Sequence, residues 1–132
     1  MKFLILCALA SYALAETTRV RATIHCGFQK RVGVPIVSLM EEDFSSVPIL
    51  NLFDSDDVLD ETTVEYGEHF TLDGGEIEIF STEPYLQIVH KCFGTERTDI
   101  IDLSEFEADS NDILHVGHIV LTHEGHKITQ AV

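Results

Sequence analysis

The sequence predicts an all-β domain, a two-sheet antiparallel β-sandwich of about 7–8 short strands. Two observations support this prediction. Apolar and polar residues alternate with a period of two in several segments, most clearly in 19–26 (RVRATIHC) and 76–80 (EIEIF). Turn residues interrupt the chain frequently between such segments, which is typical of short strands joined by tight connections.

In the first half of the chain, the alternation predicts a strand at 19–26, with Val20, Ala22, Ile24 and Cys26 on one face. A loop at 27–35 follows, because glycine and proline punctuate it. A second strand is expected at 36–42. Residues 43–61 are the least regular segment, since an apolar stretch lies there between two acidic ones.

The second half predicts a series of short strands separated by turns, at 62–66, 69–72, 76–80, 85–92 and 97–103. Asp73-Gly74-Gly75 is expected to form one of the turns. A polar connection at 104–112, with room for one helical turn, leads to a final pair of strands at 113–123 and 126–132. Glu124-Gly125 joins this pair, and a two-residue loop with glycine in second place indicates a hairpin.

The first fifteen residues, MKFLILCALASYALA, have the pattern of a secretory signal peptide. Lys2 is followed by a short apolar run, and Ala13-Leu14-Ala15 has the form of a cleavage site. The run is too short to span a bilayer. We therefore expect a signal peptide at 1–15, one mature domain at 16–132, and a secreted, extracellular protein.

The composition is strongly acidic. Loss of Lys2 with the signal would leave seven of the eight Lys and Arg against 23 Asp and Glu, a net charge of 7 − 23 = −16. Such a charge argues against nucleic acid as a partner. The mature part has no apolar stretch of about 18 residues, so a membrane-spanning segment is not expected there.

Five blocks together resemble the transthyretin-like family, small secreted proteins best known from nematodes. They are VRATIHCG (20–27), VPIVSLMEED (34–43), DSDDVLDETTVEYGEHFTLDG (54–74), TEPYLQIVHKC (82–92) and VGHIVLTHEG (116–125). The resemblance implies an eight-stranded sandwich of the transthyretin type and an extracellular protein without a catalytic role. The chain departs from the pattern by an insertion around 45–53 and by lacking the cysteine that many members carry shortly after the His-x-Cys strand.

His90 and Cys92 are in phase with the apolar, inward face of strand 85–92, as Cys26 is in strand 19–26. If strands run alternately up and down, these two strands end at the same pole, where a Cys26–Cys92 disulfide can join the sheets. The alternatives are free or intermolecular thiols, or a nucleophilic Cys92 next to a base. His90 is expected at the edge of the core, hydrogen-bonded to a carbonyl.

Two patterns suggest a metal site, and neither meets its requirements. In HEGH (123–126) the histidines are three apart across an expected turn, whereas a zinc-protease motif needs them four apart on a helix. A hairpin would instead place His123 opposite His126 as surface residues. The acidic run from Asp54 to Glu68 lacks calcium-loop spacing. The hydrolases related to transthyretin end in Tyr-Arg-Gly-Ser, which this chain lacks, so we expect no catalytic residues, no metal and no cofactor.

We interpret the chain as a non-enzymatic binding or signalling module that recognises an extracellular protein or lipid through its loops. The irregular segment is the expected contact, because apolar side chains lie there beside dense negative charge. The residues of this predicted recognition loop are Val47, Ile49, Leu50, Leu52, Phe53, Asp54, Asp56 and Asp57. The alternative is a carrier of a small hydrophobic ligand. The sequence specifies neither the partner nor the oligomeric state.

Overall fold

The computed structural model describes residues 15–28, 32–43, 57–78 and 82–130. Eight strands cover most of these residues. They are β1 (Ala15–Cys26), β2 (Val32–Asp43), β3 (Asp57–Thr63), β4 (His69–Glu78), β5 (Thr82–Lys91), β6 (Arg97–Asp102), β7 (Ile113–Thr122) and β8 (Gly125–Thr129). The signal peptide expected at 1–15 lies outside the described residues except for Ala15, and so does the predicted recognition loop from Val47 to Asp56.

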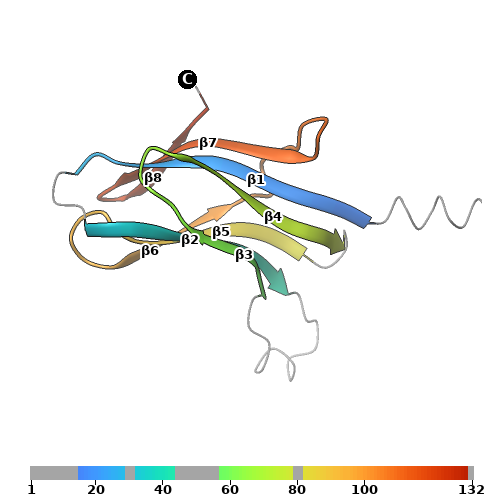
Figure 1. Cartoon of the computed structure of the whole chain (residues 1–132), viewed down its shortest axis with the longest axis horizontal. Coiled ribbons are helices and arrows are strands. Elements are labelled where there is room, and N and C mark those ends of the chain that lie inside the picture. The colour runs from blue at the N-terminus through green and yellow to red at the C-terminus, as the bar shows by residue number, and fades with distance from the viewer. Residues whose placement is uncertain (1–14, 29–31, 44–56, 79–81, 131–132) are drawn as a thin grey trace, which may run out of the picture.

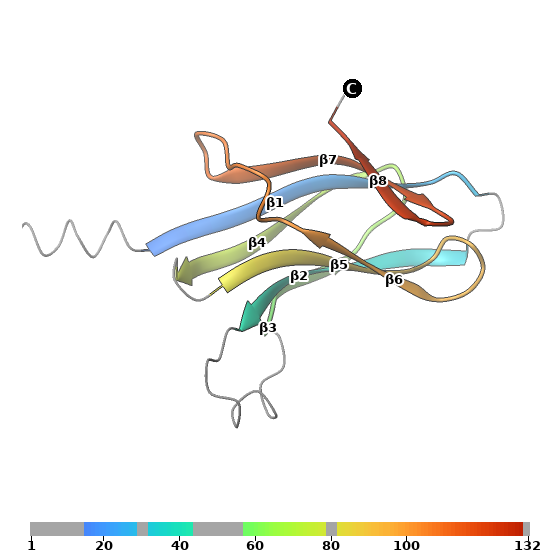
Figure 2. The same cartoon turned by 180° about the vertical axis from the view of Figure 1, so that it is seen from behind.

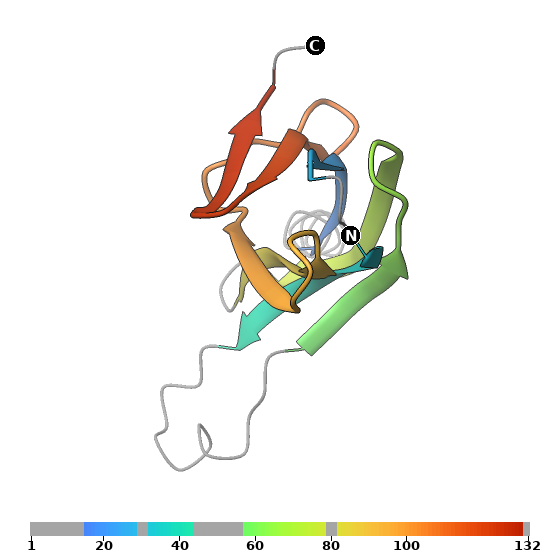
Figure 3. The same cartoon turned by 90° about the vertical axis from the view of Figure 1, so that its left-hand side faces the viewer.

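The strands form two four-stranded sheets, ordered β4-β1-β7-β8 and β3-β2-β5-β6. Figures 1 and 2 show the sheets as two stacked layers, and Figure 3 shows them from one end. The predicted all-β, two-sheet sandwich is confirmed. One pair differs from the expected antiparallel arrangement, because β1 and β7 are parallel neighbours. Successive strands along the chain alternate in direction, so all odd-numbered strands run the same way. β1 and β7 are both odd-numbered, and they are therefore parallel where they lie side by side.

The core lies between the sheets and follows the predicted alternation. Val20, Ile24 and Val37 are fully buried, as are Leu86 and Ile88 of β5. Both sheets contribute in this way to one cluster of buried side chains. Burial of apolar area of this kind is the main favourable contribution to folding.

Asp73-Gly74-Gly75 does not form the predicted turn, because it lies inside β4. The pairing of β4 with β1 shifts there, from Thr17 opposite Glu76 to Arg19 opposite Asp73. Two glycines thus lie opposite one residue of β1, which is a β-bulge. Gly75 has φ +66°, a conformation that glycine adopts without steric cost. The glycine pair therefore bends a long strand and does not separate two short ones.

A second bulge, in β7, explains why the strand looks apolar on both faces in the sequence. Its partners in β1 shift between His115 and Gly117, so the inward phase changes at this point. Leu114 before the bulge, Val116 within it, and Ile119 and Leu121 after it are all buried. These four residues therefore face the core, and strand parity assigns them to both faces in the sequence only because the bulge changes which positions point inward.

The β7–β8 hairpin turns one residue earlier than predicted. Thr122 pairs with Gly125, so His123 and Glu124 form the loop. His126 lies opposite Leu121 and not opposite His123, which contradicts the predicted cross-strand histidine pair. Irregularity was also predicted as far as residue 61, but β3 begins at Asp57. No helix in the described ranges is long and apolar enough to cross a membrane.

Candidate functional site at the disulfide pole

The structure joins Cys26 and Cys92, which are 66 positions apart in the sequence, in a disulfide with their Cα atoms 5.8 Å apart. Cys26 ends β1 in one sheet, and Cys92 directly follows β5 in the other. Both residues are buried. The bond therefore ties the two sheets together at one pole, and it removes the thiolate that a nucleophilic Cys92 would need.

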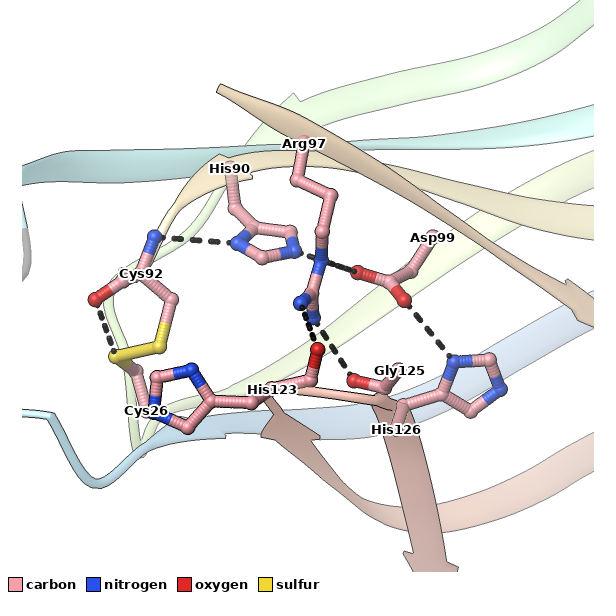
Figure 4. Close-up of polar contacts among 8 residues, drawn as sticks. All are labelled: Cys26, His90, Cys92, Arg97, Asp99, His123, Gly125 and His126. Atoms are coloured by element: carbon pink, nitrogen blue, oxygen red, sulfur yellow. Dashed lines mark hydrogen bonds and ion pairs between the residues drawn. A yellow bond between two sulfur atoms is a disulfide. The ribbon is translucent and has the colours of Figure 1, made fainter. Parts of the chain in front are cut away.

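His90 is fully buried beside this disulfide, and both of its ring nitrogens are engaged (Figure 4). Nδ1 accepts a hydrogen bond from the backbone N–H of Cys92 at 3.1 Å. The ring proton must then reside on Nε2, which lies 2.6 Å from Oδ2 of Asp99 and donates to it. The prediction that His90 bonds to a carbonyl is wrong, because its partner is the buried carboxylate of Asp99.

Arg97 links this buried pair to the other sheet. Its Nε donates to Oδ2 of Asp99 at 3.1 Å. The two terminal nitrogens donate to the carbonyl oxygens of His123 and Gly125, at 3.3 and 2.9 Å. Figure 4 shows the guanidinium between β6 and the β7–β8 turn. One side chain of β6 thereby fixes the position of a hairpin in the opposite layer.

Asp99 is the common acceptor of the pole, with a side chain only 7% exposed. Its Oδ1 also lies 3.3 Å from Nδ1 of His126. Burial by itself raises the pKa of the Asp99 carboxyl. Hydrogen bonds from His90, His126 and Arg97, together with the positive guanidinium, lower that pKa further than burial raises it. Asp99 is therefore ionised at neutral pH and holds three donors around it.

An aromatic group covers the network on the side of the turns. The rings of Phe93 and His123 lie 4.3 Å apart, and Phe28 is 5.6 Å from Phe93. The guanidinium carbon of Arg97 lies 4.9 Å from the centre of the Phe93 ring, within cation–π range. We call Phe28, Phe93, His123 and Arg97 the aromatic pole. Its phenylalanines are half-buried and its histidine is exposed, so it forms part of the surface.

The other predicted candidates have structural roles or lie outside the described residues. His123 and His126 of HEGH make unrelated contacts, one with Phe93 and the other with Asp99. In the acidic run, Glu61 accepts a hydrogen bond from Ser38 at 2.7 Å. No group of three or more potential metal ligands comes together in the described parts of the chain.

Sequence reasoning missed Asp99 and Arg97, although a signal was present. Asp99 is in phase with Ile101 and Leu103, which are both buried. A charged residue at an inward position needs a partner, and the inward His90 on the neighbouring strand was an available one. The order of strands β5 and β6 was needed to bring the two together.

The fold and the pole together define a class: a two-sheet β-sandwich closed by a disulfide and a buried ionic network. The model of the transthyretin-like family matches residues 23–103. The chain belongs to the transthyretin-like family, and the predicted resemblance is confirmed. Proteins of this family are generally non-enzymatic.

The chain is also similar to Transthyretin-like protein 1 of Caenorhabditis elegans, with 32% identity over 77 residues. The match covers 58% of this chain and 48% of that protein, so the chain spans about half the length of this relative. A solved structure of a 9R-lipoxygenase from Cyanothece aligns with 87% of this chain and 20% of that chain, at 6% identity and a TM-score of 0.41. A TM-score this low supports no argument about fold or function.

Proposed function

We propose that this protein is a secreted, non-enzymatic module that recognises an extracellular protein partner through the loops at the ends of the sandwich. The observation that carries the proposal is the state of the disulfide pole. Both nitrogens of His90 are engaged inside the chain, and so are both oxygens of Asp99. Cys92 is held in the disulfide. His90, Asp99 and Cys92 thus stabilise the fold, and this supports a function based on recognition by surface residues.

The aromatic pole has the composition of a protein-binding surface. Aromatic residues and arginine dominate binding energy at interfaces, where they act as rigid anchors. Phe28 and Phe93 lie next to the disulfide, and Arg97 is held by two backbone carbonyls. A partner would therefore meet side chains that lose little conformational entropy on binding.

The irregular segment between β2 and β3 is a second proposed contact. It combines apolar residues from Val47 to Phe53 with the acidic residues Asp54 and Asp56, and Asp57 follows at the start of β3. Such a combination suits a partner with an apolar patch and a basic rim. Deletion of Ser45–Phe53 should leave the sandwich folded and weaken partner binding, and added salt should weaken it too.

The test is proximity cross-linking of the secreted protein in native extracellular fluid, followed by mass spectrometry and direct binding of the recovered partner. Phe28→Ala should weaken partner binding by about tenfold, which corresponds to roughly 1.4 kcal/mol. Ile100→Ala is the matched control, because it removes exposed apolar surface from the outer face of β6. Equal affinities for the wild type, the folded Phe28→Ala variant and the folded deletion variant would refute recognition through these loops.

One observation favours the alternative, a carrier of a small hydrophobic ligand. A half-open hollow of about 300 Å³ lies on the outer face of β2 and β5, and Val34, Ile36 and Val89 contribute to its lining. Val34 and Ile36 are 45% and 40% exposed. A stoichiometric lipid or other small molecule that co-purifies with the wild type and is lost from an Ile36→Ser variant would favour the carrier.

A further inference from the structure

The outer face of the β4-β1-β7-β8 sheet carries four of the seven histidines of the chain. We call His25, His69, His115 and His118 the histidine face. Across the strands, Thr23 of β1 is in register with both His69 of β4 and His118 of β7. His115 and His118 are three positions apart and share this face only because the β7 bulge changes the phase between them. The face belongs to a different surface from the aromatic pole.

A half-open hollow of about 230 Å³ opens in this face. Its lining includes Arg21, Thr23, His69, His115, His118 and Gln130. Thr23 is only 2% exposed although it points to the outer side, because the larger side chains around it cover it. A buried hydroxyl bonded to an imidazole, in a hollow lined by further imidazoles and a guanidinium, makes this a polar site.

The hydrogen bonds around the hollow determine which atoms remain for a ligand. Nδ1 of His69 lies 2.6 Å from the hydroxyl of Thr23. Nδ1 of His118 lies 2.7 Å from Nε2 of His25. When these two Nδ1 atoms accept, each neutral ring carries its proton on Nε2. Both histidines then have one N–H donor left, and no other described residue bonds to either Nε2.

Arg21 adds donors to the same hollow. Only its Nε has a described partner, the hydroxyl of Thr71 at 3.3 Å. The terminal guanidinium nitrogens therefore remain for a ligand. His115 does not contribute, because its Nε2 is held by Asp109 at 2.7 Å. The hollow thus combines an arginine fork with two imidazole N–H groups, a set of donors without a competing carboxylate of its own.

We propose that this hollow binds a small oxyanion, such as sulfate, phosphate or a carboxylate, through the guanidinium of Arg21 and the Nε2–H groups of His69 and His118. The site goes beyond the proposed recognition at the poles and does not depend on it. A planar guanidinium matches the oxygen geometry of such anions. The local charge also favours an anion, although the whole chain has a net charge of −15.

Acidification should tighten binding, because protonation of an imidazole adds positive charge and a second N–H donor. Burial, followed by the neighbouring His118 and His69, lowers the pKa of His25, so protonation of this ring is disfavoured. Among the side chains that the structure describes, the titratable and charged groups on the face are Arg19, Arg21, His25, His69, Asp73, His115, His118 and Lys127, with Asp109 in the connection before β7.

The experiment is a titration of the full secreted chain with sodium sulfate at constant ionic strength, followed through the ring signals of the histidines by NMR. Sulfate keeps its charge across the range, so only the protein titrates. We expect saturable shifts of the His69 and His118 signals, and a higher affinity for sulfate at pH 5.5 than at pH 7.5. Arg21→Gln should weaken binding by about tenfold, the effect of one charge-assisted contact. Lys127→Gln, on the same face and outside the lining, should change it less than about threefold.

Three outcomes would overturn the proposal. They are the absence of saturable shifts at pH 5.5, an equal loss in folded Arg21→Gln and Lys127→Gln variants, and shifts caused by zinc and not by sulfate. Vesicles of phosphatidylglycerol identify the source of the oxyanion. Co-sedimentation that requires Arg21 would support a lipid headgroup, and sulfate binding without co-sedimentation would support a free anion.

Discussion

Replacement of Asp99 by Asn should lower the free energy of unfolding by about 2 kcal/mol at neutral pH. Oδ2 of Asp99 accepts hydrogen bonds from His90 and Arg97, and Oδ1 lies opposite His126. An asparagine can keep its oxygen toward the first two donors, and its NH₂ group can donate to Nδ1 of His126. The number of hydrogen bonds is then unchanged, and the variant loses their ionic character.

The magnitude follows from the strength of these bonds. A hydrogen bond to a charged group contributes about 1.5–3 kcal/mol, and a neutral one about 0.5–1.5 kcal/mol. Three bonds weakened by about 1 kcal/mol each would cost about 3 kcal/mol. Asparagine also avoids the burial of a charge in a side chain that is 7% exposed in the wild type, which offsets part of this loss. About 2 kcal/mol remains.

Urea unfolding with the disulfide intact measures this difference. Asp102→Asn is the control on the same strand, because Asp102 is exposed and its bond to the Ser104 N–H can be kept by asparagine. We expect the control to remain within about 0.5 kcal/mol of the wild type. An equally small effect of Asp99→Asn would contradict the role assigned to the network.

The pH dependence gives a second measurement on the same variant. The folded-state pKa of Asp99 lies below its ordinary value of 3.8. A lowered carboxyl pKa contributes stability above the unfolded-state pKa, and this stability is lost as the pH falls through the folded-state value. The gap between the wild type and Asp99→Asn should therefore be constant from neutral pH to about pH 5 and close in stronger acid. A gap that widens in acid would refute the reasoning.

Three further predictions concern the disulfide, the β7 bulge and the hairpin histidines. Non-reducing peptide mapping should recover a cross-linked Cys26–Cys92 peptide, and loss of the bond should cost about 4 kcal/mol by loop entropy; quantitative thiol labelling without reductant would contradict it. Gly117→Ala should lower the melting temperature much more than Gly27→Ala does. Gly117 has φ +91° and an added Cβ would lie 2.7 Å from a backbone oxygen, whereas a Cβ at position 27 would meet open space. Equal melting temperatures of the two variants would refute this. Zinc titration should show no submicromolar site that depends on the histidines of 123–126, and abolition of such a site by a double alanine variant would disprove the prediction.

Local alternation was sufficient to predict the fold class and the inward faces of most strands. Val20, Ile24, Leu86 and Ile88 are buried where a period of two placed them. The same parity placed Cys26 and Cys92 toward the core. These features depend on neighbouring residues within one strand, and the sequence records them directly.

The tertiary structure decided the features that depend on register between distant strands. His25 and His118 are 93 positions apart, and they meet because β1 and β7 run parallel and because a bulge changes the phase of β7. A shift of one residue moves a side chain to the opposite face, so strand parity alone could not place His115 and His118 together. The partners of Asp99 likewise come from β5, β6 and β8. A charged residue at an inward position of a predicted strand shows that partners are needed. Only the packing of the two sheets determines which residues supply them.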